Sequence, residues 1–272
     1  MTETTSVIFT SDQHINSTVG LSLPAIELDD GWFYRSSRTQ SWLWECWQDF
    51  WEQAGKLPGR RVGIFNGDLG ELDTKRRSNQ LITVNKATIL RHVLTVLEPA
   101  LAVLDAVIII RGTTAHVGKA SWLEEAIAND LDLTIRPDGM GSWYHFRGSA
   151  SGVRLDVAHH ASMGGLPWTE KDAAGKVAKV IAWRYAVDLK QPLPHVAVRS
   201  HNHRYADSGR NYETFAVCLP AWTAITEYGY RLGKENSIAD IGGAWIVCED
   251  GKYQFDELRY QPKEGRVWRL KI

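Results

Sequence analysis

Cysteine is scarce in this chain, and no long apolar stretch lies near its N-terminus. Only three of the 272 residues are cysteine, namely Cys46, Cys218 and Cys248, and no two of them form a C-x-x-C pair. This spacing does not suit a disulfide framework, so we expect buried thiols in a reducing cytoplasm. A membrane span needs about 20 consecutive apolar residues, and a secretory signal needs a shorter run. We therefore expect a cytoplasmic protein with no membrane partner.

An excess of charge of one sign is also missing. The chain has 31 lysines and arginines against 32 aspartates and glutamates, which gives a net charge of −1 at pH 7. Strong non-specific binding to nucleic acid depends on a broad basic field, so we do not expect it here. Linkers, low-complexity segments and internal repeats are not found either. A chain of this length can bury a substantial core, and we expect residues 1–272 to form a single domain.

Tryptophan, by contrast, is abundant, with 12 residues. Trp44, Trp47 and Trp51 recur at helical spacing and predict the buried stripe of a helix over residues 42–53. Strands and helices alternate in the first half of the chain and strands dominate afterwards, an order that suits two mixed sheets with helices outside. Further helices are predicted over residues 85–105, 122–130 and 169–188.

Aspartate and histidine residues follow five apolar runs, each of which predicts a buried strand. The runs cover residues 6–10, 61–65, 106–110, 153–158 and 196–199. Because the ends of successive strands meet at one edge of an open α/β sheet, the polar side chains are expected to gather there. Carboxylates and imidazoles gathered in this way are the ligands of a pair of divalent metals. The residues concerned are Asp12, His14, Asp68, His116, His159, His160, His201 and His203.

The order of these clusters resembles the calcineurin-like metallophosphoesterase superfamily. The pattern of that family is D-x-H, G-D-x-x-D/E, G-N-H-D/E, H and G-H-x-H. The corresponding elements here are residues 12–14, 67–71, 112–116, 159 and 200–203. The resemblance covers most of the chain and implies an α/β fold, the four-layer αββα sandwich of two mixed sheets flanked by helices.

Residue by residue, the resemblance implies two divalent metal ions. It assigns Asp12, His14 and His203 to the first metal and His159 and His201 to the second, with Asp68 as the bridge between them. A bridging carboxylate suits two dications about 3.5–4 Å apart. Nitrogen and oxygen ligands without thiolate suit Mn²⁺, which the resemblance favours, with Fe, Zn²⁺ and Mg²⁺ as alternatives.

The third element departs from the family pattern, because Thr113 follows Gly112 where the family has asparagine. A threonine hydroxyl could reach a metal or a phosphate, but it is a poorer ligand than an amide carbonyl. The second metal is therefore expected to bind more weakly. Alternatively, Asn66 or Asn85 could take the place of the missing ligand.

His116 lies two positions later than the histidine of the family's third element. The resemblance implies that it is the catalytic acid that protonates the leaving oxygen. It could instead be an ordinary residue ahead of a helix that begins with a capping box over residues 121–124. Arg111 or Arg204 could steady the charge of the phosphate, and a surface salt bridge is an equally good explanation for either arginine.

His160 and an insertion that contains Trp32 are the candidates for further contacts with the substrate. His160 could contact the substrate, support a ligand from behind, or simply belong to a polar turn. An insertion over residues 17–40 begins beside His14, and Trp32 within it could line a cleft and stack on a base. The alternative for Trp32 is burial in the core, which is common for large aromatic residues.

These residues predict dinuclear-metal-dependent hydrolysis of phosphate esters. The expected activity is that of a phosphodiesterase or nuclease acting on nucleotides or nucleic acid. A phosphomonoesterase acting on small molecules or phosphoproteins is the alternative. A non-catalytic metal-binding scaffold is a further alternative, with Thr113 as the only feature in its favour. The sequence leaves the oligomeric state open.

Overall fold

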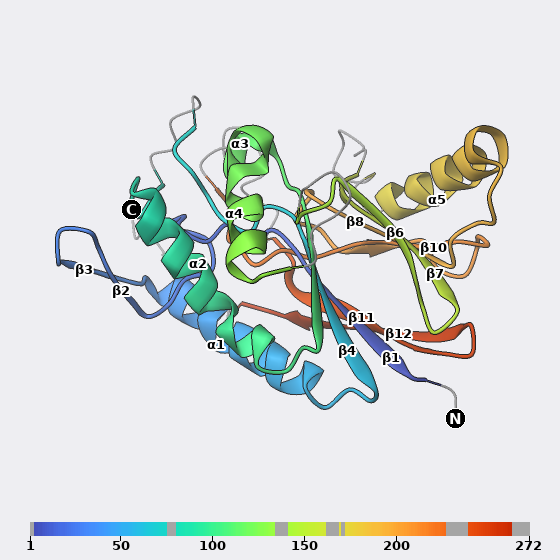
Figure 1. The fold of residues 1–272 in the computed structure, drawn as a ribbon, viewed down its shortest axis with the longest axis horizontal. Helices are drawn as coiled ribbons and strands as arrows, with labels where there is room; N and C mark the ends of the chain where they lie inside the picture. Colours follow the sequence, from blue (N-terminus) through green and yellow to red (C-terminus); the bar gives the residue numbers. More distant parts are fainter. Residues whose placement is uncertain are drawn as a thin grey trace, which may run out of the picture.

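Two five-stranded mixed sheets face each other and carry helices on their outer sides (Figure 1). The structure is a computed structural model that describes residues 3–74, 80–133, 141–161, 169, 172–226 and 239–262.

The first sheet has the strand order β12-β11-β1-β4-β5. Strands β1, β4 and β5 run parallel, while β11 and β12 are antiparallel to their neighbours. Every residue of β1 is buried, as expected for a central strand with both of its faces covered. The bounds are β1 Thr5–Thr10, β4 Arg60–Asn66, β5 Ala106–Ile110, β11 Ile241–Glu249 and β12 Lys252–Tyr260.

The second sheet has the order β6-β7-β8-β10-β9. Its three central strands are parallel, and the two edge strands are antiparallel to them. The bounds are β6 His145–Ala150, β7 Val153–His160, β8 Val196–Ser200, β9 Ala206–Asp207 and β10 Phe215–Cys218. A separate hairpin is formed by β2 (Ala25–Glu27) and β3 (Phe33–Arg35).

Three apolar layers join the sheets and helices. Ile8 of β1 points into a cluster with helices α1, α2 and α4, whereas Val7 and Phe9 point into the layer between the two sheets. A third cluster lies between the second sheet and α5. The αββα sandwich expected from the sequence is thus confirmed. The helices are α1 Arg38–Ala54, α2 Lys86–Leu101, α3 Thr114–Val117, α4 Trp122–Asp130 and α5 Ala173–Arg184, with a 3₁₀ turn η1 at Lys119–Ser121 and a π-helix η3 at Tyr185–Leu189.

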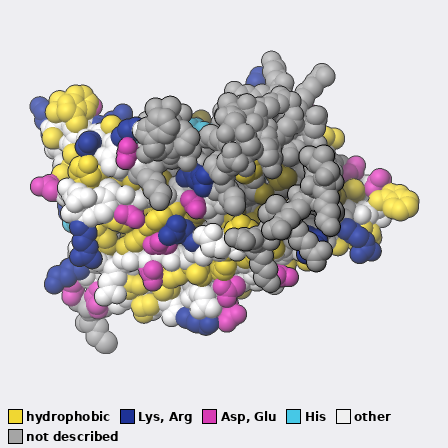
Figure 2. Space-filling view, turned by 180° about the vertical axis from the view of Figure 1, so that it is seen from behind, with side chains coloured by type: hydrophobic (Ala, Val, Ile, Leu, Met, Phe, Trp, Pro, Cys, Tyr) yellow, Lys and Arg dark blue, Asp and Glu magenta, His cyan; other side chains and the backbone are white. Residues whose placement is uncertain are grey.

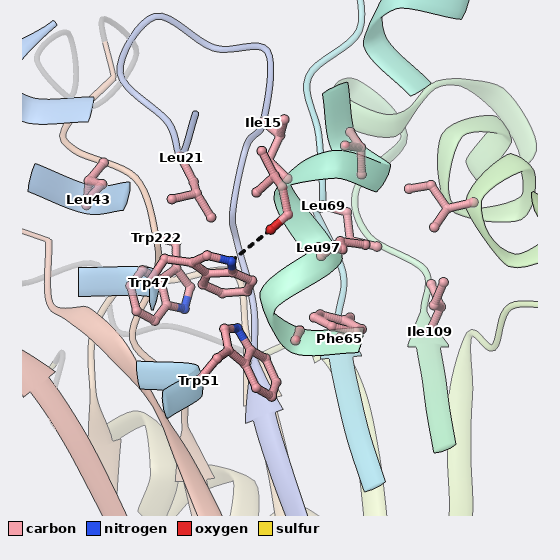
Figure 3. Close-up of a cluster of buried hydrophobic side chains, with 14 of the residues drawn as sticks. Ile15, Leu21, Leu43, Trp47, Trp51, Phe65, Leu69, Leu97, Ile109 and Trp222 are labelled. Carbon is pink, nitrogen blue, oxygen red and sulfur yellow. Dashed lines mark hydrogen bonds between the residues drawn. The ribbon is translucent and has the colours of Figure 1, made fainter. Parts of the chain in front are cut away.

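The tryptophan-rich helix α1 fills the core as predicted. It begins with a capping box in which Ser37 and Gln40 bond each other's backbone. Trp47 and Trp51 are fully buried, Trp44 is partly buried, and the Trp47 indole N–H donates to the carbonyl of Val96 on α2 (2.9 Å; Figure 3). The helix therefore anchors the first sheet from behind.

All three cysteines are free and buried. Among the described helices, none has the length and apolar character needed to cross a membrane.

Candidate metal centre

The carboxyl ends of the parallel strands in both sheets meet at one edge of the sandwich. Asp12 and His14 follow β1, Asp68 follows β4, and His201 and His203 follow β8. All five have a left-handed backbone, with φ between 44° and 75°. Such a conformation costs about 1–3 kcal/mol per non-glycine residue and persists where the surrounding structure enforces it. The strain is concentrated where side chains must turn toward a common point.

The first donor group consists of Asp12, His14 and His203. Nε2 of His203 lies 3.2 Å from Oδ1 of Asp12 and 3.2 Å from Nε2 of His14, and the distance from His14 Nε2 to Asp12 Oδ1 is 3.9 Å. Two imidazole nitrogens and one carboxylate oxygen therefore converge as the sequence predicts. Burial lowers the pKa of His203, which favours the neutral form that binds metals.

Glu71 supports this group from behind, a role that the sequence analysis did not assign. His14 Nδ1 donates to Glu71 Oε2 at 2.9 Å, and His116 Nδ1 donates to the same carboxylate at 2.8 Å. Burial alone would raise the pKa of Glu71, but the two histidines outweigh it and lower the pKa to about 2. The carboxylate thus fixes both rings and directs Nε2 of His14 toward the metal position. Glu71 occupies the last position of the G-D-x-x-D/E pattern, and this position is the feature of the sequence that could have indicated its role.

The second donor group consists of Asp12, Asp68, His159 and His201. Oδ2 of Asp68 lies 3.0 Å from His159 Nε2 and 3.9 Å from His201 Nδ1. His159 Nδ1 donates to the carbonyl oxygen of Asn66 at 2.6 Å, so Nε2 is the nitrogen that faces the donors. Burial would lower the pKa of His159, but Asp68 and Asp12 together raise it to about 10.

Asp12 is shared by the two groups, and its two oxygens differ. Oδ2 accepts from the Ser11 hydroxyl at 2.6 Å and from the His201 backbone N–H at 3.2 Å. Oδ1 is buried and makes no well-formed hydrogen bond among the described residues, although Nε2 of His203 lies 3.2 Å from it and Nε2 of His159 lies 3.9 Å from it. A buried carboxylate oxygen without a hydrogen bond is costly unless a cation binds there. The donor set therefore fits divalent metal ions.

Asp68 also takes part in more than one group, because it lies with His14 and His116 in a third. Burial would raise the pKa of Asp68, but His159 and His201 hold it well below its usual range. The carboxylate is thus available as an anion between the histidines. The bridging role assigned to Asp68 stays a prediction, and the structure adds Asp12 as a second candidate for it.

Thr113 lies beside the second group. Its backbone N–H donates to Asp68 Oδ1 at 2.6 Å, and its hydroxyl oxygen lies 3.2 Å from His201 Nδ1 and 3.5 Å from His160 Nε2. A Cβ atom at Gly112 would collide with Asp68, which explains the glycine before Thr113. The hydroxyl is thus at the place where the sequence predicts a weak ligand.

The two asparagines considered as substitutes have other partners. Asn85 caps helix α2 by accepting from the backbone N–H groups of Ala87 and Thr88, so it is not available to a metal. Asn66 donates to the Ser200 hydroxyl at 2.6 Å and thereby joins the ends of β4 and β8, while its Oδ1 is buried and finds no hydrogen-bond donor in the part of the chain that the structure describes.

The capping box predicted over residues 121–124 is absent, because Ser121 has a left-handed backbone and makes no side-chain cap. Glu124 instead turns toward the strand ends and is fully buried. It accepts the backbone N–H groups of Asp68 at 2.9 Å and Gly112 at 3.0 Å. Burial raises the pKa of Glu124 to about 8, with Asp68 adding to the effect. The sequence offered no signal for this contact.

His116 reaches the centre from the short helix α3. Its ring lies edge-on to that of His14, with 4.6 Å between centroids. Burial would lower its pKa, but the hydrogen bond with Glu71 and the neighbouring carboxylates raise the pKa to about 9. A protonated imidazole beside the donor groups is the arrangement expected of a general acid.

Arg111 and Arg204, the two candidate phosphate contacts, differ in their surroundings. The Arg111 guanidinium bonds Ser142 at 2.8 Å, lies 3.4 Å from Glu125 on α4, and covers the ring of Tyr144. These contacts tie the end of β5 to α4 as a salt bridge, but Arg111 is buried, so the pair does not lie on the surface as the alternative had it. Arg204 follows His203 directly and is partly buried.

His160 and Trp32 lie in different places. His160 is exposed, and its ring packs against those of His159 and His201, so it borders the second group on the solvent side. Trp32 is 75% exposed at the tip of the β2–β3 hairpin, which projects from the α1 end of the molecule (Figure 1). The core alternative for Trp32 is therefore wrong. Tyr34, which lies in strand β3 of the same hairpin, is tied to α1 by a hydrogen bond from its hydroxyl to the Gln40 side chain (2.7 Å).

No protein-family model matches this chain, and no curated protein matches it either. Solved structures that are similar to it include the following three. Vacuolar protein sorting 29 from Cryptosporidium parvum is 11% identical over 96% of this chain and 100% of that chain, with a TM-score of 0.46. A dimetal phosphatase from Danio rerio is 10% identical over 94% and 99%, with a TM-score of 0.43. The 5'-nucleotidase from Candida albicans is 9% identical over 94% and 51%, with a TM-score of 0.43.

Proposed function

We propose that this chain hydrolyses phosphate esters with two divalent metal ions, and more narrowly that it is a phosphodiesterase or nuclease acting on nucleotides or nucleic acid. One observation carries the proposal. Among the described residues, Asp12 Oδ1 is buried without a well-formed hydrogen bond, and it lies between two sets of histidine and carboxylate donors. The resemblance of the motifs to calcineurin-like metallophosphoesterases extends to the αββα layers and supports the same conclusion.

Seven residues would hold the two ions. Nitrogen and oxygen donors without thiolate suit Mn²⁺, with Fe, Zn²⁺ and Mg²⁺ as alternatives. Such a pair polarises phosphoryl oxygens and makes water nucleophilic at neutral pH. The buried thiols support a reducing cytoplasm as the compartment. The proposed ligands are Asp12, His14 and His203 for one ion, His159, His201 and the Thr113 hydroxyl for the other, and Asp68 between them.

The chain itself supplies the proton for the leaving oxygen. With Nδ1 bonded to Glu71, His116 has Nε2 left for proton transfer. Glu71 keeps the ring oriented and charged until the ester bond breaks. A proton donor matters most when the leaving oxygen is a poor leaving group, as in the sugar hydroxyl of a nucleotide. This chemistry supports esters of a sugar hydroxyl, as in nucleotides, as the substrate class.

Substrate contacts are proposed for residues at the rim of the centre. His160 is exposed beside Thr113 and His201, where it can donate to a phosphate oxygen. Arg204 is proposed to add positive charge on the His203 side. Arg111 remains a weaker candidate for the same task, because its guanidinium already bonds Ser142 and Glu125.

The test is hydrolysis of a chromogenic phosphodiester and of the matching monoester, by protein stripped with a chelator and then reloaded with Mn²⁺. We expect activity that depends on Mn²⁺, with the diester preferred, and a much larger loss for His116→Gln on a nucleotide diester, whose leaving group is a sugar hydroxyl, than on the chromogenic diester, whose leaving group is activated. Preference for the monoester would replace the diester assignment. No hydrolysis of either ester by protein loaded with two ions would indicate the non-catalytic scaffold.

A further inference from the structure

Two apolar patches are exposed at opposite ends of the long axis of the molecule. One is the tip of the β2–β3 hairpin, and the other is the outer side of α5 and η3 (Figure 1). In Figure 2, which is seen from behind, hydrophobic side chains protrude at both ends; basic groups lie around the left one, at the α5 end, and both acidic and basic groups lie beside the right one, at the hairpin end. Adjacent exposed aromatic and aliphatic side chains of this kind commonly mark interaction surfaces.

The hairpin patch consists of Trp32 and Phe33 with the acidic residues Glu27, Asp29 and Asp30. Trp32 is 75% exposed and Phe33 is 60% exposed. The patch is held in shape, because Glu27 pairs with Phe33 across the two strands and the Leu28 N–H donates to the Trp32 carbonyl at 2.7 Å. Between residues 25 and 35 there are three acidic residues and one basic residue, and a second basic group, the Arg91 guanidinium, donates to the Glu27 carbonyl at 2.9 Å, so the acidic residues remain in excess. The tip is thus apolar and negatively charged.

The helix patch consists of Val180, Trp183 and Val187, with the basic residues Lys179 and Arg184. The three apolar residues are spaced three and four apart and are all exposed, with Trp183 at 60%. They lie on the side of α5 away from the buried residues that pack on the second sheet. Between residues 172 and 190 there are four basic residues and two acidic ones. This patch is apolar and positively charged.

We infer that the hairpin patch of one copy of this chain binds the helix patch of a second copy, so that the protein associates head to tail. The charges of the two patches are opposite, which favours this pairing. Two helix patches or two hairpin patches would bring like charges together. Because the patches lie at opposite ends, one molecule cannot satisfy its own. A contact between two different surfaces of identical chains leads to open chains or to rings.

The contact is expected to be weak and sensitive to salt. Each patch offers only two or three apolar side chains, which is less than the roughly 800 Å² per partner of a standard stable interface. The charged residues around them are exposed to solvent, so added salt screens their attraction. Association should therefore grow with protein concentration and fall as the ionic strength rises.

Sedimentation velocity of the full chain with complementary variants tests the inference. The hairpin variant is Trp32→Ser with Phe33→Ser, and the helix variant is Val180→Ser with Trp183→Ser. Each variant alone should remain monomeric at concentrations where the wild-type chain associates. An equimolar mixture should form dimers and nothing larger, because one intact hairpin patch then meets one intact helix patch. Tyr144→Ser, which removes an exposed aromatic outside both patches, should associate like the wild type.

Several outcomes would overturn the inference. A wild-type chain that stays monomeric at every concentration would do so, as would two variants that both associate normally. Dimers formed by one variant alone would show that the other patch pairs with itself. A mixture that stays monomeric would show that the two patches do not meet. All of these variants change exposed side chains, and circular dichroism confirms that each is folded before it is compared.

Discussion

Two clusters of buried charge in this molecule look alike by burial and differ in their partners. Asp156 in β7 has a hydrogen-bond donor on each oxygen: its Oδ1 accepts from the Arg199 guanidinium at 2.6 Å, and its Oδ2 accepts from the neutral Tyr185 hydroxyl at 2.8 Å. Asp12 at the end of β1 is equally buried, yet its Oδ1 has no hydrogen bond among the described residues and faces histidines. Burial of a carboxylate is therefore no sign of function by itself. A buried carboxylate oxygen that lacks a well-formed hydrogen bond and faces histidines, which bind metal ions in their neutral form, does indicate a functional site.

The largest effect is expected from Asp68→Asn, which removes a shared anion from the metal centre. Turnover and metal content should both fall, by well over the ~10–100-fold loss that is typical of substitutions at residues that hydrogen-bond the metal ligands. Metal analysis and single-turnover hydrolysis measure this. Near-normal turnover with two bound ions would contradict the role of Asp68.

The opposite result is expected for Asp156→Asn. It leaves buried Arg199 without its counter-charge and should cost about 3–5 kcal/mol of unfolding free energy, measured with urea. Turnover per folded molecule should stay normal. Glu52→Gln, which breaks an exposed ion pair with Lys56, should cost under about 1 kcal/mol. An Asp156 variant that is stable but inactive would erase the distinction between the two clusters.

The stability gap of Asp156→Asn should also depend on pH. Burial would raise the pKa of Asp156, but His145 and Arg199 hold it well below its usual value of 3.8. A carboxylate with a lowered pKa stabilises the fold above the pKa of the unfolded chain, and this stabilisation is lost as the pH falls toward the folded value. Wild type and variant should therefore differ fully at neutral pH and converge below about pH 4.

A smaller effect is expected from Glu71→Gln, which acts on the first donor group alone. The amide oxygen can still accept from both histidine N–H groups, but it carries no charge, so it holds the rings of His14 and His116 less firmly. Affinity for the first ion should fall about 10–100-fold in competition with a chelator, while the second ion is retained. Glu257→Gln, a carboxylate bonded to Tyr205, is the matched control and should change nothing.

The smallest change is expected from Thr113→Asn, which supplies the amide that the family pattern has at this position. The second ion should bind up to about tenfold more tightly, or about 1.4 kcal/mol, in a Mn²⁺ titration of activity. Thr114→Asn, one residue further on and exposed, should leave the titration unchanged. Equal affinity for both ions in the wild type would show that the Thr113 hydroxyl is no handicap.

The sequence was sufficient for the sandwich and for the convergence of the ligands. Apolar runs that end in Asp or His place both the strand and the side chain, as for Asp68 after β4 and His159 in β7. It was not sufficient for residues that act from outside the strand ends. Glu124 lies on a helix and resembles a capping residue until its burial is seen, and Glu71 matched a motif position without revealing its two histidine partners.

The exposure of side chains and the pairing of buried charges also could not be predicted from the sequence. Trp32 could equally be core, cleft or surface, because a turn has no periodicity that shows which way a side chain points. Asp156 interrupts an apolar strand without any mark that its partners are Arg199 and Tyr185, which come from separate elements. Both outcomes depend on contacts between distant parts of the chain.

Counting bound metal ions tests the central claim most directly. After reconstitution with Mn²⁺ and removal of free metal under conditions that retain the weaker ion, the wild-type chain should hold two ions. His203→Ala should hold one, in the second group, and His159→Ala should hold one, in the first. A wild-type chain that binds a single ion, or two variants that both lose all metal, would contradict two donor groups joined at Asp12.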